Sequence, residues 1–134
     1  TLSRSSAASD VYKRQILGVS MIAVCEAFVM ADNLGLDRSK MFDVVSTASG
    51  SCWAINTYCP VPNVGPNTPA DNNYIPGFSA DLMLKDLGLA KTAAEETNSF
   101  TPLGKEAYAL YENFFSKGGE GKDFSAILNF IKDS

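Results

Sequence analysis

The sequence predicts an all-α domain, and three observations support that class. Apolar residues recur at helical spacing in several segments, capping residues, proline or glycine stand at the ends of those segments, and no segment alternates in the manner of a strand. With 134 residues, 46% of them hydrophobic, the chain has enough apolar mass for one core. We therefore predict a single domain with a long first helix, smaller helices and one long ordered loop.

Residues 1–14 differ in composition from the rest of the chain. Alanine and serine are frequent there and no apolar period is evident, so we expect a disordered tail or a frayed helix start. The run from Ser5 to Gln15 also resembles the adaptor-derived translation found at the ends of reading frames from shotgun assemblies. We expect these residues to be non-native and the helical domain to span residues 15–134.

A long helix is predicted from Ile16 to Leu34, with apolar residues on every face, so that it needs packing partners all round. Gly35 is placed to end it. The polar residues within 16–31 make that stretch too short and too polar for a membrane span. Asp37 can cap a second helix over 38–47. Its inward residues are Met41, Phe42 and Val45.

The next segments are a short helix over 53–58 and a long irregular segment over 59–77. The irregular segment holds every proline except Pro102 and several asparagines, so we predict no regular element in it. Two interpretations stay open, a tolerated surface insertion and an ordered flap packed on the helices. We favour the flap because apolar side chains are spread along the segment: Tyr58, Val61, Val64, Tyr74 and Ile75.

A further helix begins at Ser79, which can cap it, with Asp81 in the first turn where the helix dipole favours an anion. Its packing seam is Met83, Leu87, Ala90 and Ala94. Lys85 lies roughly 160° from that seam, above Leu82, Gly88 and Leu89. Lys85 is therefore either an ordinary solvated lysine or a cation presented to a ligand, with Gly88 allowing a close approach.

Two helices complete the chain. Thr101 and Pro102 begin one that runs to Lys117 and ends at a glycine-rich turn. Its predicted inward residues are Leu103, Ala107, Leu110, Phe114 and Phe115. Asp123 can cap the last helix, which carries Phe124, Ile127, Leu128 and Ile131.

Composition excludes several kinds of chemistry. There is no histidine for a Ser-His-Asp or Cys-His set, and the three cysteines have no metal-ligand spacing, so we predict no metal site. The net charge of −4 and the lack of a basic cluster exclude nucleic acid and membrane partners. No glycine-rich turn between a strand and a helix is present to bind a dinucleotide pyrophosphate. Four aromatic residues could stack on a planar ligand or belong to the core: Trp53, Tyr58, Tyr74 and Phe78.

Several motifs occur in an order that resembles one family. They are Ser49-Gly50-Ser51-Cys52-Trp53, Thr57-Tyr58, Pro60-Val61-Pro62, Asn72-Asn73-Tyr74, Gly77-Phe78 and Lys85-Asp86-Leu87-Gly88-Leu89-Ala90. This series is similar to the helical C-terminal domain of the β-hydroxyacid dehydrogenases, in particular the 3-hydroxyisobutyrate dehydrogenases. The resemblance covers 15–134 and implies a helical domain of the 6-phosphogluconate-dehydrogenase-like type.

The resemblance also implies that the site is shared between two domains. Family members pair such a domain with an N-terminal Rossmann domain, absent from this chain, and oxidise 3-hydroxyisobutyrate to methylmalonate semialdehyde in valine breakdown with NAD, NADP not being excluded. By resemblance, Lys85, Asp86 and Phe78 would bind the cofactor. Trp53 and Ser49 are candidates for the substrate side.

The family's catalytic residues are not found at their places. The family has a lysine eight residues before the glycine that matches Gly18, and an asparagine one turn later. These positions hold Asp10 and Arg14 here. We therefore expect the isolated chain to be inactive, and the other class of function that fits is a non-catalytic helical binding or assembly module. We also expect a homo-oligomer located in the cytoplasm, or in the mitochondrial matrix of a eukaryote.

Overall fold

The computed structural model describes the backbone of residues 6–134 and the exposure of the side chains of residues 9–134. Within that range the chain forms helices joined by turns and loops, and no strand is present. The one strand-like pairing among these residues is an isolated antiparallel bridge between Ser79 and Asp123. The predicted all-α class is confirmed. The expectation of a non-native or disordered tail lies, for residues 1–5, outside the described residues.

The first helix, α1 (Ser6–Asn33), begins ten residues before the predicted start at Ile16. Of the two alternatives for this stretch, a disordered tail and a helix start, residues 6–14 form the start of the helix. Alanine costs nothing in a helix, and this first part of α1 gains tertiary contacts, because Val11 is buried and Arg14 pairs with Asp86 on α4 (Ala80–Glu96).

The greater length of α1 also corrects the argument that it is too short for a membrane span. By length and composition alone, the stretch Ser9–Asn33 could cross a membrane. Core helices pass the same test, and α1 packs against each of the other α-helices of the described chain, with its most extensive contact on α4.

The next two helices are shorter than predicted, because α2 (Arg38–Val45) ends before Thr47 and α3 (Trp53–Asn56) ends before Tyr58. Gly35 follows α1 with a φ of 76°, a conformation that glycine adopts without strain. Asp37 caps α2 as predicted, since its Oδ1 accepts a hydrogen bond from the Lys40 backbone N–H at 3.0 Å.

The segment over 59–77 is an ordered flap, as favoured from the sequence. Val61 and Val64 are buried, and the Tyr74 hydroxyl donates to the Pro60 carbonyl oxygen at 2.7 Å. Two details differ from expectation. The segment contains a short 3₁₀ helix, η1 (Pro69–Asn72), which a capping box at Thr68 supports, and Ile75 is 68% exposed.

Helix α4 follows the sequence prediction closely. The Ser79 Oγ accepts from the Leu82 N–H at 3.2 Å, and Met83, Leu87 and Ala90 are buried. The helix can approach α1 closely at Gly18, where a Cβ would lie 3.1 Å from a methyl group of Leu87. The surface lysine Lys85 lies off this seam and is exposed.

The last part of the chain departs from the predicted pattern at two places. Helix α5 (Pro102–Phe114) gives way to a wider π-type turn, η2 (Phe115–Gly119), before the predicted end at Lys117. Leu103, predicted to point inward, is 67% exposed, and the buried aromatic residue of α5 that periodicity missed is Tyr111. The chain closes with η3 (Phe124–Ala126) and α6 (Ile127–Lys132).

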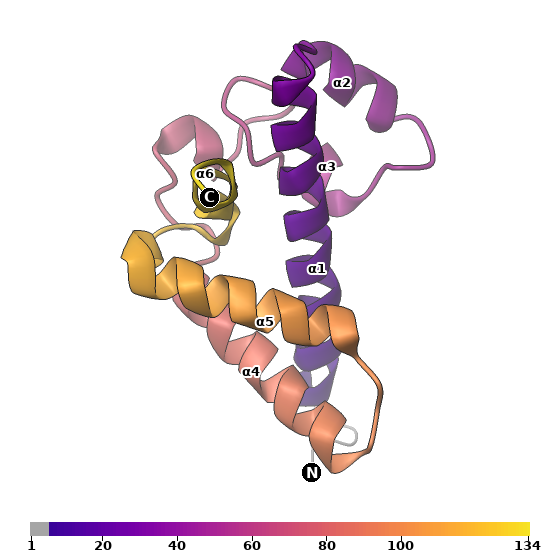
Figure 1. The fold of residues 1–134 in the computed structure, drawn as a ribbon, viewed down its shortest axis with the longest axis vertical. Coiled ribbons are helices and arrows are strands. Elements are labelled where there is room, and N and C mark those ends of the chain that lie inside the picture. The colour runs from indigo at the N-terminus through magenta and orange to yellow at the C-terminus, as the bar shows by residue number, and fades with distance from the viewer. Residues whose placement is uncertain (1–5) are drawn as a thin grey trace.

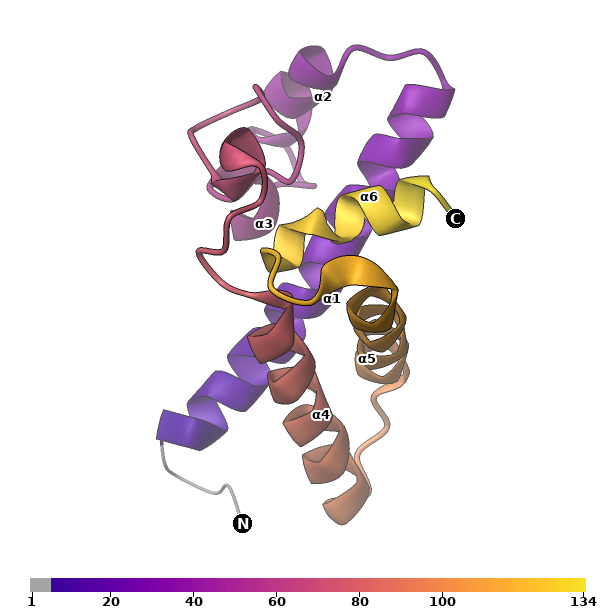
Figure 2. The ribbon, with the colours of Figure 1, turned by 90° about the vertical axis from the view of Figure 1, so that its left-hand side faces the viewer.

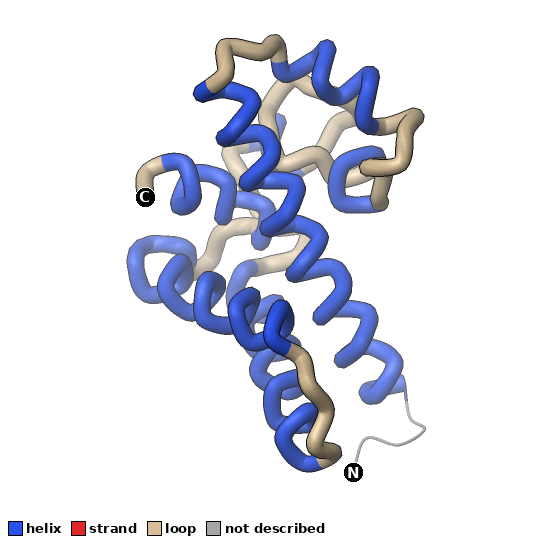
Figure 3. The backbone as a smooth tube through the Cα atoms, turned by 45° about the vertical axis from the view of Figure 1, so that its right-hand side comes forward, coloured by secondary structure: helices blue, strands red, loops and turns tan. Residues whose placement is uncertain are grey.

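Helix α1 runs the length of the molecule, and the other elements lie along it. Figures 1 and 2 show α4 and α5 beside the N-terminal half of α1, and α2, α3 and the flap beside its C-terminal half. The backbone tube of Figure 3 shows that α6 crosses between these two groups. The N-terminal end of α1 therefore lies at the same end of the molecule as the connection from α4 to α5.

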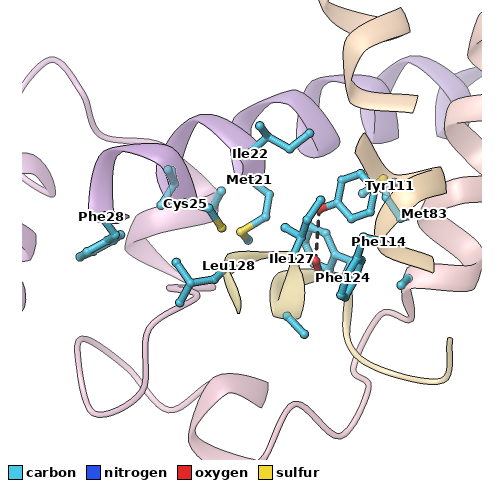
Figure 4. Packing of buried hydrophobic residues seen from close by; sticks show 14 of the residues in the cluster. Met21, Ile22, Cys25, Phe28, Met83, Tyr111, Phe114, Phe124, Ile127 and Leu128 are labelled. Carbon is cyan, nitrogen blue, oxygen red and sulfur yellow. Dashed lines mark hydrogen bonds between the residues drawn. The ribbon is translucent and has the colours of Figure 1, made fainter. Parts of the chain in front are cut away.

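The core lies where α1 meets α4, α5 and α6 (Figure 4). Each large apolar side chain buried there stabilises the fold by roughly 1.5–3 kcal/mol. The Tyr111 hydroxyl satisfies its hydrogen-bonding need by donating to the Phe124 carbonyl oxygen at 3.2 Å (Figure 4). The fully buried members of the core include Met21, Cys25, Phe28, Met83, Leu87, Tyr111, Phe124, Ile127 and Leu128.

Candidate functional site

Three of the residues singled out from the sequence meet where α1 faces α4. The Arg14 Nη1 lies 3.2 Å from the Asp86 Oδ2, and the Arg14 guanidinium lies 4.1 Å from the centre of the Phe78 ring. A cation above an aromatic face and beside a carboxylate is held by both. Asp86 is therefore engaged by a residue of this chain, and Arg14 connects two of the three candidate cofactor residues.

The third candidate, Lys85, precedes Asp86 and points to a different side of α4. Lys85 is exposed and forms no ion pair within residues 6–134. Leu82 and Leu89, one turn away on either side, are 49% and 41% exposed. Lys85 thus presents an ammonium group with three N–H donors above an apolar surface, as the sequence predicted.

Gly88 does not leave open space for a ligand. A Cβ at Gly88 would lie 3.3 Å from the Tyr108 ring of α5. The close approach that this glycine permits is therefore between α4 and α5. The group that approaches Gly88 is thus the Tyr108 side chain, whereas the sequence suggested another backbone or a ligand.

The candidate substrate residue Trp53 lines an open groove of about 590 Å³ between α1 and α3. We call this the Trp53 groove. Its lining residues are Lys13, Arg14, Ile16, Leu17, Ser20, Cys52, Trp53 and Ala54. Because Arg14 belongs both to this groove and to the contact with Phe78 and Asp86, the two groups of candidate residues adjoin one another. The groove combines apolar walls with two cations, a composition that suits a small organic anion.

A buried carboxylate holds the aromatic residues behind this site. Asp123 is 0% exposed, and its Oδ1 accepts hydrogen bonds from the Tyr58 hydroxyl at 2.7 Å and from the Gly77 and Phe78 N–H groups at 2.9 Å each. Burial, reinforced by the hydrogen bond to Asp123, raises the pKa of Tyr58 well above its usual value. Tyr58 in turn stacks on Trp53, with ring centroids 5.1 Å apart.

Ser49 and Asp10, two further positions predicted from the family resemblance, lie outside the site. Ser49 is exposed in the turn after α2 and is not among the residues that line the Trp53 groove. Asp10 is exposed and lies 3.7 Å from the Lys13 Nζ. Of the aromatic residues considered for stacking on a ligand, Tyr74 instead bonds to the flap, as described above.

Sequence reasoning missed the roles of Arg14 and Asp123. Arg14 was considered only as a mismatch to the asparagine position, and Asp123 only as a helix cap. Asp123 does cap η3, since its Oδ2 accepts from the Ser125 N–H at 3.1 Å and from the Ser125 Oγ at 2.6 Å. Nothing in the local sequence signals the bonds of its other oxygen, which come from segments 45 to 65 residues away.

The all-helical fold and the exposed Lys85 on α4 are those expected of the helical domain of a cofactor-dependent dehydrogenase. A comparison with protein families matches residues 5–131 to the family described as NAD-binding of NADP-dependent 3-hydroxyisobutyrate dehydrogenase. The chain belongs to this family. The predicted resemblance is confirmed, and the match includes most of the residues before Gln15.

Individual relatives agree with the family match. A probable 3-hydroxyisobutyrate dehydrogenase of Mycobacterium tuberculosis is 44% identical over 125 residues, which are 93% of this chain and 42% of the relative. The mitochondrial 3-hydroxyisobutyrate dehydrogenase of Drosophila melanogaster is 40% identical over 93% of this chain and 39% of the relative. The chain therefore spans about two-fifths of the length of the curated relatives that it matches, and it covers their C-terminal part.

Solved structures show the same relationship. The structure of the Mycobacterium tuberculosis 3-hydroxyisobutyrate dehydrogenase with L-serine matches with a TM-score of 0.89 at 44% identity, over 93% of this chain and 43% of that one. The 3-hydroxyisobutyrate dehydrogenase of Salmonella typhimurium matches with a TM-score of 0.75 at 24% identity, which supports the fold alone. The predicted helical C-terminal domain is confirmed.

Proposed function

We propose that this chain is the helical part of an NAD(P)-dependent dehydrogenase that oxidises 3-hydroxyisobutyrate to methylmalonate semialdehyde, as in valine breakdown. The observation that carries the proposal is the 44% identity to a relative of that name, together with the exposed Lys85 and the groove lined by Trp53. The N-terminal Rossmann domain that such an enzyme needs would be the first partner, with a second copy of the chain as another.

The residues on this surface fit a nicotinamide dinucleotide in part. Lys85 is exposed and has donors for ribose or amide oxygens, whereas the half-buried Phe78 ring is covered on one face by Arg14. Asp86 fits an indirect role, because its carboxylate faces the α1 position that Arg14 occupies here. When bound, the nicotinamide accepts the hydride that the hydroxy acid gives up. The wall residues Trp53 and Leu17 would exclude water from that reaction.

This chain lacks the group that would accept the alcohol proton. By resemblance that group is a lysine at the position of Asp10, and the asparagine that holds the substrate would stand at the position of Arg14. General acid–base groups contribute about 100- to 10,000-fold to a rate. We therefore propose that the chain alone is inactive, both for this reason and because it has no pyrophosphate-binding turn.

The test is to join the chain to a Rossmann domain of the family and to make Asp10→Lys and Arg14→Asn together. Turnover of 3-hydroxyisobutyrate, followed by absorbance of the reduced cofactor, is the expected result. The joined protein that keeps Asp10 and Arg14 serves as the control, and its rate should fall by about 100-fold or more. A correctly folded joined protein that binds no cofactor would instead favour a non-catalytic assembly module.

We also propose a reducing compartment, the cytoplasm or, in a eukaryote, the mitochondrial matrix. The cysteines support this placement, since Cys25, Cys52 and Cys59 are all free thiols. Relatives from animals carry the word mitochondrial in their names. Fractionation of the source cells would check the placement.

A further inference from the structure

The two oxygens of Asp123 have different partners. Among residues 6–134, the Oδ2 accepts hydrogen bonds from the backbone N–H and the hydroxyl of Ser125 alone, two residues on, and so caps the start of η3. The Oδ1 accepts three hydrogen bonds from distant segments, one from Tyr58 and one each from the backbone N–H groups of Gly77 and Phe78. The first oxygen serves local structure, and the second joins two segments that carry candidate site residues.

Both of those segments lead directly to the site. Tyr58 stacks on Trp53 with an interplanar angle of 25°, and Phe78 lies beneath the guanidinium of Arg14. Phe124, which follows Asp123, packs against both segments, with ring centroids 5.2 Å from Tyr58 and 5.6 Å from Phe78. Trp53 and Phe78 are thus set relative to each other through one carboxylate and the ring next to it.

The chemistry of this position calls for a carboxylate. A carboxylate accepts on both oxygens, whereas an amide would turn an N–H₂ group toward donors on one side. Five hydrogen bonds to a fully buried anion are each of the charge-assisted kind, which is stronger than a neutral bond. Tyr58 remains a donor at neutral pH, because its burial holds its pKa above the ordinary value.

We propose that Asp123 is a positioning residue of the dehydrogenase site: its Oδ1 fixes the placement of Phe78 on the cofactor side relative to Trp53 on the substrate side. The inference that these are the two sides of a site rests on the proposed function. The placement itself rests only on the contacts within this chain. Each can be tested separately.

The placement is tested on the chain itself, in which Trp53 is the single tryptophan and therefore an unambiguous fluorescence reporter. Asp123→Asn should shift the Trp53 emission maximum and increase its quenching by acrylamide. Ser125→Ala is the matched control, because it removes a bond to Oδ2 and leaves the three bonds to Oδ1 intact. Its Trp53 emission and quenching should equal those of the parent.

Should Asp123→Asn fail to fold, Tyr58→Phe decides in its place, because it keeps the aromatic ring and removes a single bond to Oδ1. A folded variant of either kind whose Trp53 emission and quenching match the parent would overturn the inference. So would an equal change in Ser125→Ala, since that result would mean that loss of the η3 cap alone disturbs Trp53.

The role in the site is tested in the active joined enzyme. Asp123→Asn and Tyr58→Phe should each raise the KM for cofactor and for hydroxy acid by about tenfold, with Ser125→Ala unchanged. Unchanged KM values in both variants overturn the role in the site. A parent joined enzyme without any turnover overturns the proposed function instead, and the Trp53 measurement on the chain then decides the placement by itself.

Discussion

Arg14 occupies the two neighbouring candidate cofactor residues, Asp86 and Phe78. Its guanidinium bonds to the Asp86 carboxylate and covers the Phe78 ring, so that neither is presented alone to a ligand. Lys85, which has no such partner among residues 6–134, keeps its donors for an external group. A single turn of α4 thus carries an engaged carboxylate next to an available cation.

The first prediction concerns Lys85 in the active joined enzyme. Replacement by alanine removes a charged donor to the cofactor, a hydrogen bond of roughly 1.5–3 kcal/mol, so apparent cofactor affinity should fall by about ten- to a hundredfold. Thermal unfolding should change little, because the residue is exposed. Steady-state titration with cofactor measures the effect.

Lys105→Ala is the control for this experiment, since Lys105 is an exposed lysine on the adjacent helix α5. Its cofactor KM should equal that of the parent. If Lys85→Ala also kept a normal KM and kcat, Lys85 would be an ordinary solvated lysine.

At the scale of the element, α4 has one face that packs in the core and another that carries Lys85 toward solvent. Met83, Leu87 and Ala90 form the buried seam, while Leu82 and Leu89 are substantially exposed beside Lys85. The two kinds of leucine on one helix therefore allow the packing contribution to be measured without changing the residue type.

We predict that Leu87→Ala lowers the free energy of unfolding by about 2–5 kcal/mol, because it removes a side chain that is 1% exposed and leaves a cavity. Leu89→Ala, at 41% exposure, should cost less than about 1 kcal/mol. Urea denaturation followed by circular dichroism compares the two. Equal losses would show that the α4 seam is not the one described.

The junction of α1 and α2 makes stability depend on pH. Arg38 binds Asp32 through two hydrogen bonds, of 3.0 and 2.7 Å, and the bond to Arg38 lowers the pKa of Asp32 below its usual 3.8. A carboxyl whose pKa is lower when folded stabilises the fold above its unfolded pKa of about 3.9. That contribution is lost as pH falls through the folded pKa.

Asp32→Asn should therefore destabilise the chain by roughly 0.5–1 kcal/mol at pH 7, the range of a partly exposed ion pair. The difference from the parent should shrink below about pH 4. Denaturation curves across this pH range measure it. Asp43→Asn is the control, since Asp43 forms no ion pair within the described chain, and a pH-independent effect of Asp32→Asn would contradict the argument.

At the scale of the whole molecule, α1 is both the central packing element and an exposed apolar surface. Its residues Val19, Ile22 and Ala23 line an apolar groove of about 320 Å³ with Leu103 of α5, and Ile16 and Met30 are more than half exposed. Exposed apolar side chains of this kind favour contact with another domain or another copy.

We predict that the isolated chain self-associates at micromolar concentration, as measured by sedimentation velocity. Leu103→Glu should raise the monomer fraction, because it places a charge beside Glu26 and Glu106 in the groove. Val44→Glu, on an exposed position of α2, should not. A parent chain that sediments as a stable monomer would show that the apolar residues of α1 need no contact with another chain.

The site was partly predictable from the sequence. The motif around Lys85 placed that residue on an exposed face, and the family resemblance was found from short motifs that lie in the correct order. The contact of Arg14 with Asp86 was not predictable, because it joins residues 72 apart and rests on the N-terminal extension of α1. The same extension explains why the Ile16 start was wrong.

Local signals determined the helices. The caps at Asp37 and Ser79, and the seam of α4, depend on residues three or four positions apart, and the chain encodes such relations directly. Tertiary structure alone decided which apolar residues would be covered, as with Leu103 and Tyr111, because burial depends on which elements meet. It also decided that Asp123 would hold Tyr58 and Phe78, since those partners are brought to a buried carboxylate only when the core closes around it.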